Sequence, residues 1–171
     1  MTPRPPERLR AETPLVIGVG NENRGDDAAG LRVTSELRSL VGDRVLVVDC
    51  LGGATDLLDL WEGRGRVYLI DAVRSGGVPG SWRRVLVRDQ PLPSALAGTS
   101  THGLSVASAV ALGQTLGRMP EQLVVYGIEA AQFDPGAELS PEVRAGVESV
   151  ALELAEELRS AAPAEKIGDG R

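Results

Sequence analysis

Short runs of valine, isoleucine and leucine alternate with helical patterns along this chain, and this alternation limits the folds that the chain can adopt. Five of the runs have the length of strands: Leu15–Val19, Val45–Val48, Val67–Ile70, Arg83–Val87 and Leu123–Ile128. Continuous apolar runs are typical of strands that are covered on both faces. The pattern therefore predicts a buried, mostly parallel five-stranded sheet.

Amphipathic patterns fill most of the intervals between the runs. Apolar residues recur with helical spacing from Ala29 to Val41, a shorter helix is expected from Ala54 to Trp61, and a third begins near His102. The last helix has Ser140 at its N-cap and Pro141 in its first turn. Strands that alternate with helices in this way predict a three-layer α/β/α sandwich.

The fourth strand is expected to differ from the others in direction. Three glycines and a proline lie between residues 76 and 80, and the connection is too short for a helical crossover. We therefore expect the fourth strand to be antiparallel, at one edge of the sheet. A single α/β domain is expected over residues 14–160, with residues 1–13 and 161–171 as flexible tails, because these ends lack apolar periodicity.

The composition restricts the partners. The formal net charge is −6, and an acidic surface repels the phosphate backbone, so no nucleic-acid partner is expected. No apolar run approaches the roughly 20 residues that cross a bilayer, and the polar, proline-rich start is unlike a signal peptide. Cys50 is the only cysteine, which rules out an intramolecular disulfide and favours the cytoplasm.

The loop Gly18–Gly30 follows the first apolar run, where a phosphate-binding loop would lie. A dinucleotide fingerprint fails because Asn23 takes the place of its last glycine. A Walker A loop fails because Asp26 and Asp27 replace its lysine and hydroxyl residue, and two carboxylates repel a polyphosphate. The pair suits a cation, although acidic residues also stabilise a helix N-terminus by about 0.3–1 kcal/mol.

Carboxylates also lie close to the ends of three other predicted strands. Asp49, Asp71 and Glu129 follow the second, third and fifth runs, and the only histidine, His102, opens a helix. Ligands of such sheets bind beyond the carboxyl ends of the parallel strands, and carboxylate oxygen and imidazole nitrogen are metal ligands. Each residue also has an ordinary alternative, since carboxylates cap loops and histidines form hydrogen bonds on surfaces.

Taken together, Asp27, Asp71 and His102 match a known family. The chain closely resembles the [NiFe]-hydrogenase maturation endopeptidases over most of residues 14–159. The matching segments are VIGVGNENRGDDAAG from Val16, DCLGGATDLL from Asp49, LIDA from Leu69, STHGL from Ser100, and YGIE from Tyr126 with LSPEV from Leu139.

The resemblance implies a specific activity. Such enzymes remove a short C-terminal extension from the precursor of a hydrogenase large subunit, after nickel has been inserted into that precursor. Nickel then comes with the substrate, and the residues that contact it fall on Asp27, Asp71 and His102. Relatives often have glutamate at the position of Asp27, and Gly52-Gly53 matches a turn that would let a substrate strand approach the rim.

The predicted function is therefore that of a metal-dependent endopeptidase, a monomer whose partner is the hydrogenase precursor. Asp27, Asp71 and His102 are the expected catalytic and metal-binding residues, with Asp26 or Asp49 as a candidate general base. A serine or cysteine mechanism would need the one histidine twice. The alternatives are a metal-sensing chaperone that does not cleave, a phosphorylase-like enzyme, and a protease for another protein.

Overall fold

The computed structural model describes residues 12–87, 92, 93, 96 and 106–161. Its five strands form one sheet in the order β2–β1–β3–β5–β4. The strands are β1 (Leu15–Val19), β2 (Leu46–Cys50), β3 (Arg66–Val73), β4 (Trp82–Val87) and β5 (Gln122–Glu129). β2, β1, β3 and β5 are parallel, and β4 pairs antiparallel with β5 at one edge, which confirms the predicted sheet.

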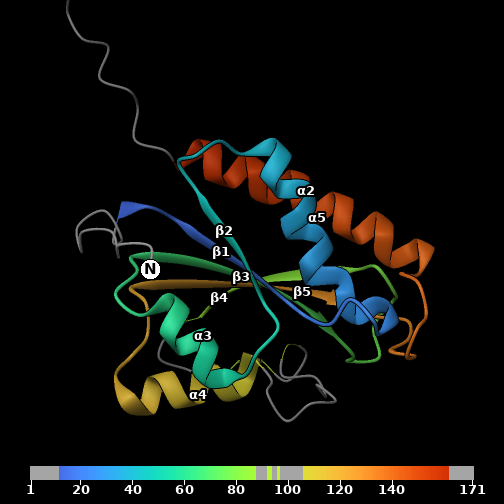
Figure 1. The fold of residues 1–171 in the computed structure, drawn as a ribbon, viewed down its shortest axis with the longest axis horizontal. Helices are drawn as coiled ribbons and strands as arrows, with labels where there is room; N and C mark the ends of the chain where they lie inside the picture. Colours follow the sequence, from blue (N-terminus) through green and yellow to red (C-terminus); the bar gives the residue numbers. More distant parts are fainter. Residues whose placement is uncertain (1–11, 88–91, 94–95, 97–105, 162–171) are drawn as a thin grey trace, which may run out of the picture.

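Helices cover both faces of the sheet, as predicted for a three-layer sandwich (Figure 1). α2 (Ala29–Leu40) and α5 (Pro141–Ser160) pack on one face, and α3 (Ala54–Trp61) and α4 (Val106–Leu116) pack on the other. A short 3-10 helix, η1 (Gly25–Ala28), precedes α2. Each face has its own apolar core, and alternate residues of every central strand contribute to one core or the other.

The strands extend further at their carboxyl ends than the apolar runs indicated. Asp49 lies within β2, Asp71 lies within β3 and Glu129 is the last residue of β5, so none of them follows its strand. The reason is cross-strand pairing, since β3 and β5 remain paired from Arg66 and Gln122 as far as Val73 and Glu129. Polar residues at these ends are therefore held in rigid backbone.

Two other expectations need refinement. The described part of the third helix, α4, begins at Val106, and His102 lies outside the described residues, as do residues 1–11 and 162–171 of the predicted tails. Ser140 is the N-cap of α5 and Pro141 follows it, but the Ser140 side chain does not cap its own helix. Its hydroxyl has another partner, described below.

Candidate active site at the carboxyl edge of the sheet

The direction of the chain reverses between β1 and β3. From β1 the chain passes through α2 on one face to β2, and from β2 it passes through α3 on the other face to β3. In open α/β sheets such a switch point leaves a crevice beyond the carboxyl ends of the two strands, where ligands bind. Asp27 follows β1 and Asp71 lies near the end of β3, so both carboxylates belong to this crevice.

Asp71 has a strongly perturbed environment. It shares a face of β3 with Leu69 and Val73, and it is half-buried. Burial and, secondly, the negative charge of Asp27 raise the pKa of Asp71 to about 8, while a hydrogen bond from the Ala72 backbone acts in the opposite direction. The two predicted ligands are thus close enough to repel each other, and a cation between them would relieve that repulsion.

Glycines allow the Asp27 loop to approach β3. A Cβ atom on Gly30 would lie 2.4 Å from the carbonyl oxygens of Ile70 and Val19, and one on Gly18 would lie 2.4 Å from the Gly30 carbonyl oxygen. Any side chain at these positions would push the first turn of α2 away from the sheet. The two glycines therefore set the distance between the η1 turn and Asp71.

Asp26 has surroundings that differ from those of Asp27. Its side chain is completely buried, with 0% exposure. One carboxylate oxygen, Oδ2, accepts hydrogen bonds from the backbone N–H groups of Ala131 and Gln132 at 2.8 and 3.0 Å. The Ser140 backbone N–H donates to Oδ1 at 2.7 Å, and the Ser140 hydroxyl donates to Oδ2 at 2.9 Å. These contacts favour a structural role over that of a general base, which needs access to a water molecule.

Asp49 and Glu129 also have partners within the fold. Asp49 accepts a hydrogen bond from the Thr34 hydroxyl at 2.5 Å and forms an ion pair of 3.0 Å with Arg38. Both partners lie on α2, so Asp49 is directed to the face of the sheet opposite Asp71. Glu129 accepts hydrogen bonds from the Ser75 backbone and hydroxyl and from the Gly76 backbone, and it thereby holds the loop between β3 and β4.

The described residues contain two of the three predicted metal ligands. Within these ranges, no three histidine, cysteine, aspartate or glutamate side chains come together as a group that could hold a metal ion. His102, the predicted third ligand, lies outside the described residues. The carboxylate pair of Asp27 and Asp71 fits a divalent cation in charge and ligand type, and its full ligand set stays a prediction.

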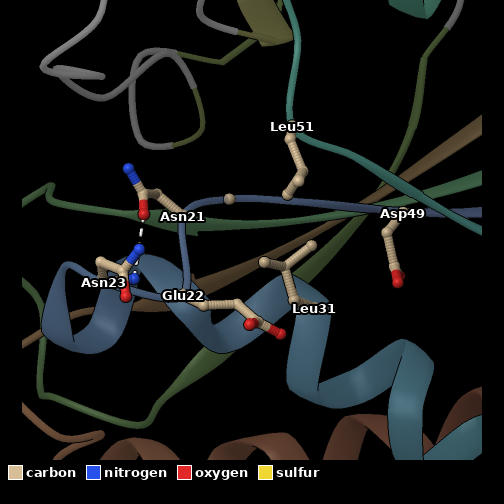
Figure 2. A pocket seen from close by; sticks show the side chains of 7 residues that line it. Asn21, Glu22, Asn23, Leu31, Asp49 and Leu51 are labelled. Atoms are coloured by element: carbon tan, nitrogen blue, oxygen red, sulfur yellow. Dashed lines mark hydrogen bonds between the residues drawn. The ribbon is translucent and has the colours of Figure 1, made fainter.

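A groove of about 350 Å³ lies beside the Asp27 loop. Figure 2 shows Asn21 and Asn23 on the loop after β1, with Leu51 approaching from the end of β2 and Leu31 from α2. Leu51, which directly follows the partly exposed edge strand β2, is itself 74% exposed. The groove therefore offers apolar and amide groups beside the loop that carries Asp27, together with the carboxylates of Glu22 and Asp49.

The sole cysteine is poorly suited to nucleophilic chemistry. Cys50 is only 4% exposed and packs in the core between the sheet and α3 and α4. Burial raises the pKa of its thiol, which disfavours the reactive thiolate. The interpretation of Cys50 as a small buried apolar residue agrees with this environment.

The fold and the acidic crevice define an α/β protein whose chemistry is placed at the carboxyl edge of a doubly wound sheet. A model of the hydrogenase maturation protease family matches residues 31–157. The hydrogenase 2 maturation protease of Escherichia coli is 29% identical over 163 residues, which cover 91% of this chain and 98% of that protein. The chain belongs to the hydrogenase maturation protease family, and its activity is that of an endopeptidase.

Further relatives agree with this assignment. The hydrogenase expression/formation protein HupD of Bradyrhizobium diazoefficiens is 32% identical over 135 residues, covering 76% of this chain and 69% of that protein. Among solved structures, the E. coli hydrogenase maturating endopeptidase HybD is similar with a TM-score of 0.72 and 26% identity, covering 88% of this chain and 94% of that chain. The maturation protease HycI of Thermococcus kodakarensis has a TM-score of 0.65 and 26% identity, covering 90% and 97%.

The sequence did not indicate one component of this edge, the segment from Ala131 to Ser140. It lies more than 100 residues away from Asp26 along the chain, yet it supplies the four hydrogen bonds to that carboxylate that are given above. Residues 131–138 have no motif of their own, and Ser140, which belongs to the LSPEV segment, has an ordinary capping pattern. Only the tertiary structure brings the segment to the first loop.

In the described ranges, every helix is too short or too polar to span a lipid bilayer.

Proposed function

We propose that this endopeptidase removes the C-terminal extension of a [NiFe]-hydrogenase large-subunit precursor that already contains nickel. The observation that carries the proposal is the repelling pair of carboxylates, Asp27 and Asp71, at the switch point of the sheet. Such a pair is costly without a cation, and nickel bound to the precursor would supply one. In this proposal nickel is part of the substrate, and the enzyme recognises it with Asp27, Asp71 and His102.

The groove beside the loop gives the precursor a place to bind. A segment of the precursor that crosses this groove would contact Leu51 and the Asn21 amide while its nickel lies against the carboxylates. The peptide bond is then cleaved by water, which adds a hydroxyl to the carbonyl carbon and a proton to the leaving nitrogen. The buried Cys50 thiol, with its raised pKa, supports direct attack by water over a covalent cysteine intermediate.

The test is cleavage of a purified nickel-loaded precursor, measured by the mass of the intact product. Wild-type protein is expected to release the extension, whereas Asp71→Asn and His102→Ala should stop cleavage with the circular dichroism spectrum preserved. Asp27→Glu should keep substantial activity, because it retains a carboxylate with one more methylene of reach. Binding without any change in precursor mass would indicate a chaperone. Full cleavage by both Asp71→Asn and His102→Ala would refute the assignment of the site.

Two further properties belong to the proposal. We propose that the enzyme acts as a monomer in the cytoplasm, because the rim has to accept a folded precursor and the chain has a single buried cysteine. Sedimentation velocity at micromolar concentration would test the monomer.

A further inference from the structure

We infer that Asp26 is a positioning residue, whose buried carboxylate locks the Asp27 turn to the segment between β5 and α5. This inference rests on the proposed function, since it concerns how the carboxylate that recognises nickel is held in place. Asp26 itself does not touch the substrate. It acts through the position of its neighbour.

Asp26 binds several donors with both of its carboxylate oxygens. Its two oxygens accept hydrogen bonds from three backbone N–H groups and one hydroxyl, all between Ala131 and Ser140 and all 3.0 Å or shorter. Hydrogen bonds to an ionised group are stronger than hydrogen bonds between neutral groups. A carboxylate with 0% exposure and four donors is therefore a strong clamp between two segments.

The side chains of Asp26 and Asp27 point in different directions. Asp26 and Asp27 are consecutive in the 3-10 helix η1, where successive side chains are separated by about 120°. When Asp26 is directed at the 131–140 segment, Asp27 is turned away from that segment and acts on Asp71. The orientation of one carboxylate thus determines that of the other.

Hydrogen bonds within the loop hold the backbone of Asp27. Its N–H donates to the Arg24 carbonyl at 3.1 Å, and its carbonyl accepts a hydrogen bond from the Asn21 N–H at 3.2 Å. Both partners are in the same loop, so these bonds maintain the shape of the loop. The clamp of Asp26 fixes the position of the loop relative to β5 and α5.

Backbone contacts complete the connection between the two segments. The Gly25 N–H donates to the Ala137 carbonyl at 3.2 Å, and the Gly136 N–H donates to the Asn23 carbonyl at 2.8 Å. Asp26 and Gln132 bond reciprocally, since the Asp26 N–H also donates to the Gln132 carbonyl at 3.2 Å. The Asp27 turn and the 131–140 segment are therefore one unit at the carboxyl edge.

Asp26→Asn is the decisive variant. An amide has a single oxygen, so its NH₂ group would face at least one of the N–H donors that now bind the carboxylate. The turn is expected to shift, and a misplacement on the order of 1 Å reduces rates by up to about 100-fold. With the nickel-loaded precursor as substrate, we expect the KM to rise about tenfold. Backbone hydrogen exchange should also become faster in peptides that cover residues 19–31 and 131–140.

The comparison with nickel-free precursor separates positioning from loss of folded enzyme. The nickel-free precursor is used as a competitive inhibitor of cleavage, and its inhibition constant should be the same for wild type and Asp26→Asn. A smaller fraction of active enzyme lowers the apparent kcat and leaves both KM and the inhibition constant unchanged. That result, with an unaltered KM, would overturn the inference.

Two additional variants keep the test informative. Ser140→Ala removes only the hydroxyl donor to Asp26, so it should raise the KM about two- to threefold. This variant tests the clamp even if Asp26→Asn does not fold. An unchanged KM would again contradict the clamp. Glu157→Gln is the control. Glu157 lies on α5, about 25 Å from Ser140 at the start of the same helix. Its carboxylate accepts hydrogen bonds from Arg84 and Tyr126. The substitution should lower stability with no change in KM. If wild type itself leaves the loaded precursor uncut, the proposed function fails instead.

Discussion

The proton on Asp71 connects the candidate site to the stability of the fold. The folded protein binds this proton with a pKa of about 8, whereas an aspartate in an unfolded chain has a pKa of about 3.9. Between these two values the folded state holds a proton that the unfolded state lacks. Stability therefore falls as the pH rises from about 4 to 8, and this contribution is constant outside that window.

Asp71→Asn should remove this pH dependence. In the absence of metal we expect the variant and wild type to differ little at pH 4.5, and the variant to be more stable by about 1–3 kcal/mol at pH 8. This range is smaller than the full shift at about 1.4 kcal/mol per pKa unit, because Asp71 is partly exposed to solvent. Urea unfolding at both pH values measures the difference.

Asp27→Asn provides a matched second variant for that experiment. It leaves Asp71 in place but removes the neighbouring charge, which is the second cause of the raised pKa. Its loss of stability between pH 4.5 and 8 should therefore be smaller than that of wild type and larger than that of Asp71→Asn. Parallel stability curves for all three proteins would show that the two carboxylates do not interact.

Single residues also show where sequence reasoning reached its limit. The doubled carboxylate of Asp26 and Asp27 predicted a cation site, but the sequence could not separate their roles, because the residues differ only in what surrounds them. The donors to Asp26 come from residues 131–140, and no local pattern reports such distant hydrogen bonds. Ser140 was correctly placed at a helix N-cap, although its hydroxyl binds Asp26 instead of its own helix.

At the scale of elements, the contact of α2 with the sheet determines the geometry of the crevice. The first turn of α2 rests on β1 and β3 at Gly30, where no side chain separates the backbones. This contact brings η1 to the end of β3. A helix held further from the sheet would separate Asp27 from Asp71 even if every other element kept its place.

Gly30→Ala should therefore affect stability and cleavage together. Its Cβ atom would lie 2.4 Å from two carbonyl oxygens of the backbone, which cannot move as a flexible side chain does. Overpacking of this kind costs about 1–3 kcal/mol, and we expect a loss of that size in the free energy of unfolding. Cleavage of nickel-loaded precursor, measured on fully folded protein, should fall by about tenfold or more.

Gly42→Ala is the control at the other end of the same helix. Nothing lies within 4 Å of a Cβ atom at Gly42, so the substitution should leave cleavage unchanged and alter stability by less than about 1 kcal/mol. Equal effects of the two substitutions would mean that the close approach of α2 to β3 is unimportant for the site.

The elements themselves were largely predictable, whereas their ends were not. The apolar runs located all five strands, and the short glycine-rich connection correctly predicted the antiparallel β4. The predicted end of the third strand, Ile70, was three residues too early, because the pairing of β3 with β5 continues through Asp71 to Val73. Strand length depends on the neighbouring strand, and a single-strand pattern cannot include that information. This difference matters, since it places Asp71 on a defined face of the sheet.

The two ends of α5 contact different parts of the molecule. Its start binds Asp26 through Ser140, and its last turns bind the sheet through Glu157. Glu157 accepts hydrogen bonds from Arg84 on β4 and from Tyr126 on β5, and these donors lower the pKa of Glu157. The helix thus connects the candidate site to the antiparallel edge of the sheet, and the fold supports the site from a distance.

The described residues, which lie between 12 and 161 with gaps from 88 to 105, contain the four strand pairings of the sheet and both apolar cores. The Leu46 N–H donates to the Pro14 carbonyl, so the pairing of β1 and β2 begins at residue 14, and α5 ends at Ser160 with Ala161 as its C-cap. A chain truncated to residues 12–161 should therefore keep its free energy of unfolding in urea within about 0.5 kcal/mol of the full chain.

The same truncated chain should cleave nickel-loaded precursor with kcat/KM within about twofold of the full chain, because Asp27, Asp71, His102 and the Asp26 clamp are all retained. A further cut that removes Pro14, or one inside the last turn of α5, is the matched contrast. Removal of residues 157–161 eliminates Glu157 and its bonds to β4 and β5, and it should cost at least about 2 kcal/mol, since three hydrogen bonds to a charged group are lost. If instead the 12–161 chain lost activity with its stability intact, the terminal residues would have a role in binding the precursor, and the single domain of residues 14–160 would be too small a unit for function.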